Sequence, residues 1–181
     1  MNNIDDFYNS ILNIRLQQNE KTKELIQGIT KKAVDEVKKV TPDLDGFCKF
    51  LASEIQENIN QNGIRNYWID LNELVNVDHV VLIAEYRTAV GMQHLLIDPS
   101  FRQFTKQENK KLIKLNDWPG EKIKDKNMVA DLLESGITEL DEKRWTDYLQ
   151  GFTENSQNIT LDNLLKEKLK REEQENDRKR K

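Results

Sequence analysis

The chain has 181 residues, with 33% charged and 36% hydrophobic side chains, a formal net charge of −4 and a pI of about 5.4. This length supports one domain with a hydrophobic core, and the acidic balance argues against a nucleic-acid-binding protein. A single cysteine excludes an intrachain disulfide and a CxxC metal site, and the two histidines lack zinc-finger spacing. We therefore expect no metal, no organic cofactor and no nucleic-acid partner.

The amino-terminal decapeptide, MNNIDDFYNS, is acidic and polar, and it lacks the basic and apolar regions of a signal peptide. The longest apolar run, Val80 to Ala84, is too short to cross a bilayer. These features predict a cytoplasmic protein that does not bind membranes. A protein secreted by a dedicated system without a cleavable signal peptide has the same features.

Helical periodicity dominates the first third of the chain. Apolar residues recur at helical spacing over Ile4–Ile14 and again over Ile26–Val40, which predicts two amphipathic helices. The pattern resumes over Leu44–Ile59, where Asn62 and Gly63 provide a carboxy-terminal cap.

The middle of the chain changes to the composition of β-strands. Tyr67–Leu71 is short and aromatic, and His79–Tyr86 is the most apolar and β-branched stretch in the chain. Met92–Asp98 is a further strand candidate that ends at Pro99. The last two stretches predict an antiparallel hairpin that turns near Ala89.

Beyond the hairpin, helical patterns return at Asn127–Glu134, at Leu140–Phe152 and after a capping Thr160. The final KREEQENDRKRK contains no apolar residue, which is typical of a frayed tail. The fold class is therefore α+β. The predicted layout is a single domain over residues 1–165, with a helical amino-terminal part (1–41), a catalytic core (42–104) and a helical carboxy-terminal part (105–165), followed by a charged tail (166–181).

Cys48 is expected in the first turn of its helix, which Asp43 or Asp45 can cap. A thiol at this position lies at the positive end of the helix dipole, among N–H groups that have no partner within the helix. Both effects favour the reactive thiolate, and the same N–H groups suit an oxyanion. Because Cys48 also falls on the apolar stripe, a small core residue is the alternative interpretation.

His79 opens the strongest strand, and Asp98 closes the partner strand. A turn near Ala89 places His79 opposite Leu96–Ser100, so Asp98 lies close enough to orient the imidazole. Thiol, imidazole and carboxylate together form the set that covalent amide chemistry requires. His94 is the rival base, but it shares a strand with Asp98, whereas an orienting carboxylate suits a base on a neighbouring element.

The block Leu44–Phe104, about a third of the chain, resembles the transglutaminase-like and papain-like thiol enzymes. The resemblance consists of a cysteine opening a helix (DGFCKFLASEIQENINQNGI), a histidine opening a strand (HVVLIAEY) and an aspartate closing the next (HLLIDPSFRQF). The last segment is similar to papain-fold toxin and deamidase domains. The resemblance implies Cys48 as nucleophile, His79 as base and Asp98 as the orienting acid.

The same resemblance implies a papain/transglutaminase-like core, in which the nucleophile helix packs on a small antiparallel β-sheet with additional amino- and carboxy-terminal helices. The chain departs from the family in two ways. Phe47 and Lys49 flank the cysteine, where many members have tryptophan or glycine. No glutamine lies between Lys31 and Cys48, where the papain branch has an oxyanion-binding glutamine.

The expected function is a cysteine hydrolase or acyltransferase acting on a protein substrate, either a protein-glutamine deamidase or a thiol protease. Amine transfer of the transglutaminase kind ranks third. A bacterial effector or toxin fits this format by analogy. The alternative is a non-catalytic helical protein-interaction module, in which Cys48 is a structural core residue. The sequence leaves the substrate and the oligomeric state open.

Overall fold

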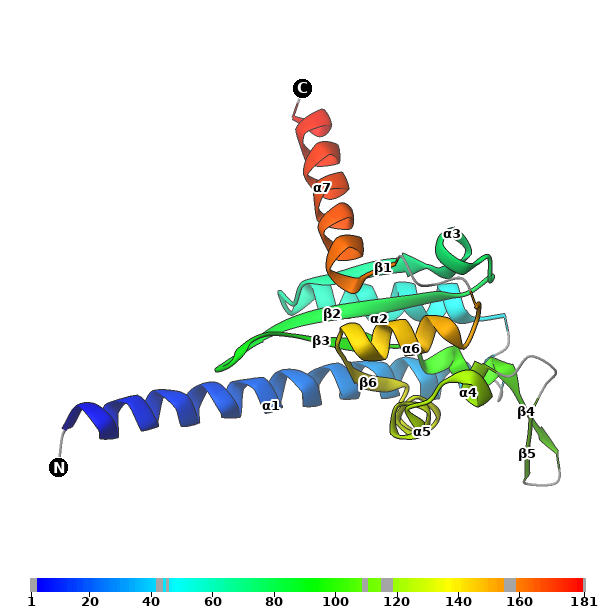
Figure 1. Cartoon of the computed structure of the whole chain (residues 1–181), viewed down its shortest axis with the longest axis horizontal. Helices are drawn as coiled ribbons and strands as arrows, with labels where there is room; N and C mark the ends of the chain where they lie inside the picture. Colours follow the sequence, from blue (N-terminus) through cyan, green and yellow to red (C-terminus); the bar gives the residue numbers. More distant parts are fainter. Residues whose placement is uncertain are drawn as a thin grey trace.

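A computed structural model describes residues 3–41, 44, 46–108, 111–114, 119–154 and 159–180 (Figure 1). Asp43 and Asp45, the expected helix caps, lie outside these residues. In chain order the elements are α1 (Asn3–Lys38), α2 (Cys48–Gln61), β1 (Asn66–Asp70), α3 (Leu71–Val75), β2 (Val80–Thr88), β3 (Gly91–Ile97), the 3-10 helix η1 (Pro99–Phe104), β4 (Thr105–Glu108), β5 (Lys111–Lys114), α4 (Pro119–Lys122), α5 (Lys126–Glu134), β6 (Ile137–Leu140), α6 (Glu142–Gln150) and α7 (Leu161–Lys179).

The central element is a four-stranded antiparallel sheet with the strand order β1-β2-β3-β6. The predicted hairpin is present as β2 and β3. Leu82 pairs with Ile97 and Thr88 with Gly91, so the chain turns at the expected Ala89. Strands β4 and β5 form a separate two-stranded hairpin. The α+β class is therefore confirmed.

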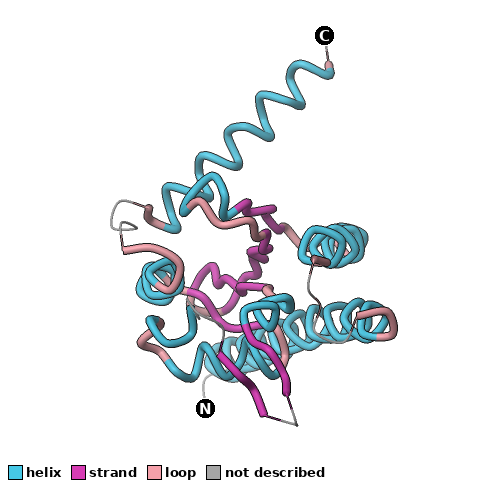
Figure 2. Tube along the Cα trace, turned by 90° about the vertical axis from the view of Figure 1, so that its right-hand side faces the viewer, coloured by secondary structure: helices cyan, strands magenta, loops and turns pink. Residues whose placement is uncertain are grey.

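Helices cover both faces of the sheet, as Figure 2 shows. Successive side chains of a strand point to opposite faces, and β2 is buried on both. Val80 and Leu82 pack with residues of α1 and α2, including Ile55. Val81 and Ile83 belong to a second cluster with residues of α5, α6 and α7. The sheet is thus the middle layer between two hydrophobic cores.

The amino-terminal part contains one continuous helix, α1, where the sequence analysis predicted two. Neither glycine nor proline separates the two apolar patterns, so nothing in the backbone interrupts the helix between them. Ile26 is fully buried in the core on the α2 side. The beginning of α1 extends past the sheet (Figure 1), and Ile4, Phe7 and Tyr8 are exposed there.

The carboxy-terminal part differs from the prediction in two places. It is not purely helical, because β4, β5 and β6 lie within it, and β6 pairs with the edge of β3. The expected frayed tail is also corrected, because α7 continues as a helix to Lys179. Thr160 caps α7 as predicted, accepting from the Asn163 N–H at 3.2 Å. No described helix has the length and apolarity that crossing a membrane requires.

Gly136 joins α5 to β6 beside the end of β3. Its φ of +75° lies in the left-handed region, which glycine adopts without steric cost. A Cβ at this position would lie 2.7 Å from the Pro99 Cα. The Gly136 carbonyl accepts from the Asp98 N–H at 2.7 Å. This glycine therefore sets how closely the α5–β6 turn approaches Asp98.

We predict that Gly136→Ala lowers the free energy of unfolding by about 2–5 kcal/mol, because left-handed strain and overpacking against Pro99 add together. Urea denaturation measures this loss. Gly63→Ala is the matched control, since Gly63 has a φ of +70° and nothing within 4 Å of the added methyl group. The control should lose only the backbone contribution, about 1–2 kcal/mol. Equal losses in the two variants would contradict the close approach to Pro99.

Candidate active site

His79 and Asp98 meet at one end of the β2–β3 hairpin. His79 directly precedes β2, and Asp98 directly follows β3, so the antiparallel pairing brings both to the same end of the sheet. The His79 Nε2 and the Asp98 Oδ1 are 2.7 Å apart, and both side chains are fully buried. The structure thus brings together the imidazole and the carboxylate that the sequence pattern paired.

Tyr148 of α6 completes the hydrogen bonding of the Asp98 carboxylate. Its O–H donates to the Asp98 Oδ2 at 2.6 Å, inside a fully buried environment. Burial, together with the neighbouring charge of Asp98, raises the pKa of the Tyr148 phenol well above its ordinary value. The phenol therefore stays protonated as a donor. In the sequence Tyr148 was only one of several apolar positions in a helix, so its contact with Asp98 was missed.

Cys48 is the first residue of α2, as predicted, and Phe47 occupies the N-cap position without a side-chain cap. The Cys48 thiol forms a hydrogen bond with His79, which lowers the pKa of the thiol. Burial opposes this shift, while the imidazole charge and the backbone N–H groups of Val80 and Lys49 reinforce it. Cys48 is 8% exposed, whereas the His79 and Asp98 side chains are fully buried.

The pKa of His79 is raised to about 9. Burial is the largest single influence and lowers the pKa, but the Asp98 carboxylate and the Cys48 thiol together outweigh it. Because the thiol pKa is lowered and the imidazole pKa is raised, the two shifts together favour a thiolate–imidazolium pair. Such a pair is the nucleophile and acid that acyl transfer uses.

Gln103 of η1 also contacts the imidazole. Its Nε2 lies 2.9 Å from the His79 Nδ1, on the side of the ring away from Asp98. An amide nitrogen can only donate, so this contact requires an unprotonated Nδ1. The contact with Gln103 therefore requires the neutral ring, whereas the raised pKa of His79 favours the protonated ring. The two forms differ by one proton on Nδ1.

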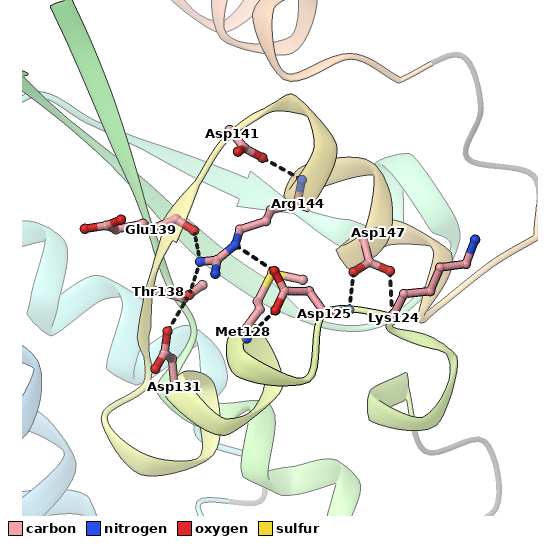
Figure 3. Close-up of polar contacts among 9 residues, drawn as sticks. All are labelled: Lys124, Asp125, Met128, Asp131, Thr138, Glu139, Asp141, Arg144 and Asp147. Carbon is pink, nitrogen blue, oxygen red and sulfur yellow. Dashed lines mark hydrogen bonds and ion pairs between the residues drawn. The ribbon is translucent and has the colours of Figure 1, made fainter. Parts of the chain in front are cut away.

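A polar network fixes the helix that carries Tyr148 (Figure 3). Arg144 of α6 donates through Nε to Asp125 Oδ2 at 3.0 Å and through Nη1 to Thr138 Oγ1 at 3.0 Å. Asp147 of α6 accepts from the Asp125 N–H at 2.8 Å. These contacts join α6 to the start of α5 and to β6. The position of the phenol is thereby set by three elements.

His94, the rival base, has a different partner. Its Nε2 lies 3.3 Å from the Glu85 Oε1 across the β2–β3 ladder, and Tyr67 donates to the same oxygen at 3.1 Å. The contact with Asp98 belongs to His79. Among the described residues, no three His, Cys, Asp or Glu side chains gather as a metal site would require.

The ring of Phe152, just after α6, stacks on His79 with centroids 6.3 Å apart and planes 29° apart.

Comparison of the chain with models of protein families, with curated proteins and with solved structures gives no match. We therefore infer the function from the arrangement of the side chains.

We predict that Tyr148→Phe lowers the free energy of unfolding by about 1–3 kcal/mol, because it leaves a buried carboxylate oxygen without its donor. Chemical denaturation provides the measurement. Tyr67→Phe is the matched control, since the Tyr67 hydroxyl donates to the partly exposed Glu85. The free energy of unfolding should fall less in this control. An equal or larger loss of stability in Tyr67→Phe would show that Asp98 does not depend on the Tyr148 phenol.

We further predict that Asp98→Asn lowers the pKa of His79 from its value of about 9, because burial is then opposed by the Cys48 thiol alone. Near pH 7.5 the wild-type ring is protonated, and we expect the variant ring to be protonated to a smaller extent. Titration of the His79 ring resonances by NMR reports the change, and the His94 resonances provide an internal reference. An unchanged His79 titration would contradict the pairing with Asp98.

Proposed function

We propose that the chain is a cysteine-dependent amide hydrolase or acyl-transfer enzyme that acts on a protein substrate. The observation that carries this proposal is the connected series of Cys48, His79 and Asp98, ended by Tyr148. The chain order of nucleophile, base and orienting acid is also that of the transglutaminase-like and papain-like thiol enzymes. Protein-glutamine deamidation and peptide cleavage are the two reactions it suits best.

The proposed chemistry begins with attack of the Cys48 thiolate on a carboxamide or peptide carbonyl carbon. The new C–S bond forms, the carbonyl oxygen takes the electron pair, and the C–N bond then breaks. The proton on His79 Nδ1 passes to the leaving nitrogen, which departs as ammonia or an amine. Water, deprotonated by the same Nδ1, hydrolyses the thioester and restores the thiol. Asp98, which accepts from Tyr148, holds the ring throughout.

Deamidation and cleavage share this thioester and differ only in the leaving nitrogen. A glutamine side chain releases ammonia, whereas cleavage of a peptide bond releases a fragment whose new amino terminus is the leaving nitrogen. Cys48 is 8% exposed and opens α2, between the half-buried Phe47 and the exposed Phe50 in the sequence. A substrate that presents a protruding side chain or an extended segment suits such a restricted approach better than a small molecule does.

The alternative, a non-catalytic interaction module, requires a structural cysteine. Leu44 and Leu51, which lie on the same apolar stripe as Cys48, pack with Val37 in a hydrophobic cluster. The Cys48 thiol instead forms its hydrogen bond with a buried imidazole. A core cysteine needs no such partner. This contact favours the enzyme.

We predict that iodoacetamide alkylates Cys48 rapidly at pH 6 in the native protein. An ordinary thiol with a pKa of about 8.5 is less than about 1% ionised at that pH, whereas a thiolate paired with an imidazolium is largely ionised. In His79→Ala the rate at pH 6 should fall about tenfold or more, because the partner that stabilises the thiolate is lost. Mass spectrometry of the intact protein measures the rate.

His94→Ala is the matched control, because it removes the other histidine, whose partner is Glu85. Its alkylation rate should equal that of the wild type. Slow alkylation of the wild type at pH 6, unchanged in His79→Ala, would identify a buried structural cysteine and overturn the proposed enzyme.

A further inference from the structure

A tetrahedral intermediate at Cys48 needs donors for its oxyanion. Donors of this kind lie about 2.7–3.1 Å from the developing charge and account for a large share of catalysis. The N–H of Cys48 is one such group, because it is the first residue of α2 and has no acceptor within the helix. A side-chain donor close to the same sulfur would complete the site.

Among the residues that the structure describes, Gln103 provides a side-chain amide for this position. Because the Asp98 carboxylate occupies the Nε2 side of His79, the Nδ1 side is left for the Cys48 thiol. The Gln103 Nε2 lies 2.9 Å from that same Nδ1. The amide nitrogen and the sulfur are therefore neighbours of one ring nitrogen, on the side where the substrate carbonyl must arrive.

The segment that carries Gln103 is firmly held. Phe101 of η1 is fully buried and belongs to the core with α5, α6 and α7. Arg102 donates through Nε to the Leu133 carbonyl at 2.7 Å. These two contacts fix the backbone from which Gln103 extends. A donor held in this way requires little reorganisation during the reaction.

The two protonation states of His79 give this amide two acceptors in turn. In the neutral ring, Nδ1 accepts from Gln103. In the imidazolium, Nδ1 carries a proton and accepts nothing, so the amide N–H loses that partner. The carbonyl oxygen of an acyl group that adds to the Cys48 sulfur gains negative charge in this space at the same stage.

We propose that Gln103 is a catalytic residue that donates its side-chain N–H to the oxyanion, together with the backbone N–H of Cys48. This inference rests on the proposed cysteine chemistry and names the missing oxyanion side chain. It places that residue five positions after Asp98 rather than before the nucleophile. The competing role is a positioning residue that acts only through His79, and the two roles have different kinetic signatures.

Two reagents distinguish the catalytic role of Gln103 from the positioning role. Iodoacetamide reacts with a thiolate by displacement of iodide and forms no oxyanion, so it reports only the thiolate and its imidazole. p-Nitrophenyl acetate is attacked at a carbonyl, passes through an oxyanion, and releases p-nitrophenolate as Cys48 becomes acetylated. The first-turnover burst of p-nitrophenolate therefore reports both the thiolate and the oxyanion donors.

The test compares wild type, Gln103→Ala and the volume-conserving Gln103→Leu, each checked for folding by circular dichroism. Loss of one oxyanion donor costs about a hundredfold or more in amide reactions, so we expect an acetylation rate lower by about tenfold or more for this activated ester. The rate of alkylation should stay within about twofold of the wild type, since that reaction has no oxyanion. Gln56→Ala is the matched control, because Gln56 is also half-buried and bonded to one side chain, Asn66.

Unchanged acetylation in both Gln103 variants would overturn the assignment. Acetylation and alkylation that fall together would also overturn it, because Gln103 would then act through His79. Failure of the proposed function has a different signature, in which the wild-type thiol itself resists both reagents and His79→Ala changes nothing. In that case the proposed function and this inference fall together.

Discussion

The buried carboxylate of Asp98 is the constraint around which the site is arranged. A carboxylate with no exposed surface is costly unless its oxygens are hydrogen-bonded or paired. Here one oxygen faces the His79 imidazole and the other accepts from Tyr148, while the Asp98 N–H donates to Gly136. Three separate parts of the chain must therefore converge on Asp98, and the geometry of each is restricted by the others.

The thiol reaches this centre from a different layer. Val80 faces the α1 and α2 core, so by strand alternation His79 faces the side of α6, from which Tyr148 arrives. Cys48 belongs to α2, which covers the opposite face of the sheet. The thiol and the imidazole meet only because the start of α2 and the start of β2 lie together. The raised pKa of His79 and the lowered pKa of Cys48 follow from that meeting.

Local patterns in the sequence were sufficient for several of these features. The alternation and turn of the β2–β3 hairpin predicted that His79 and Asp98 would lie at the same end, because antiparallel register is fixed by the turn. Helical periodicity and the Gly63 cap predicted α2, with Cys48 in its first turn. The extent of α1 was not predicted, because a polar stretch without glycine or proline neither requires a helix nor interrupts one.

The sequence by itself determined the α+β class, the hairpin and the candidate residues Cys48, His79 and Asp98, since each depends on neighbours within a strand, a helix or a single turn. Only the tertiary structure decided that Tyr148 bonds Asp98, that Gln103 reaches His79 and that β6 joins the sheet. These contacts join segments that are separated by 24 to 50 residues or that come from different layers. Periodicity and spacing describe the order within one element, whereas such contacts depend on how whole elements pack against one another.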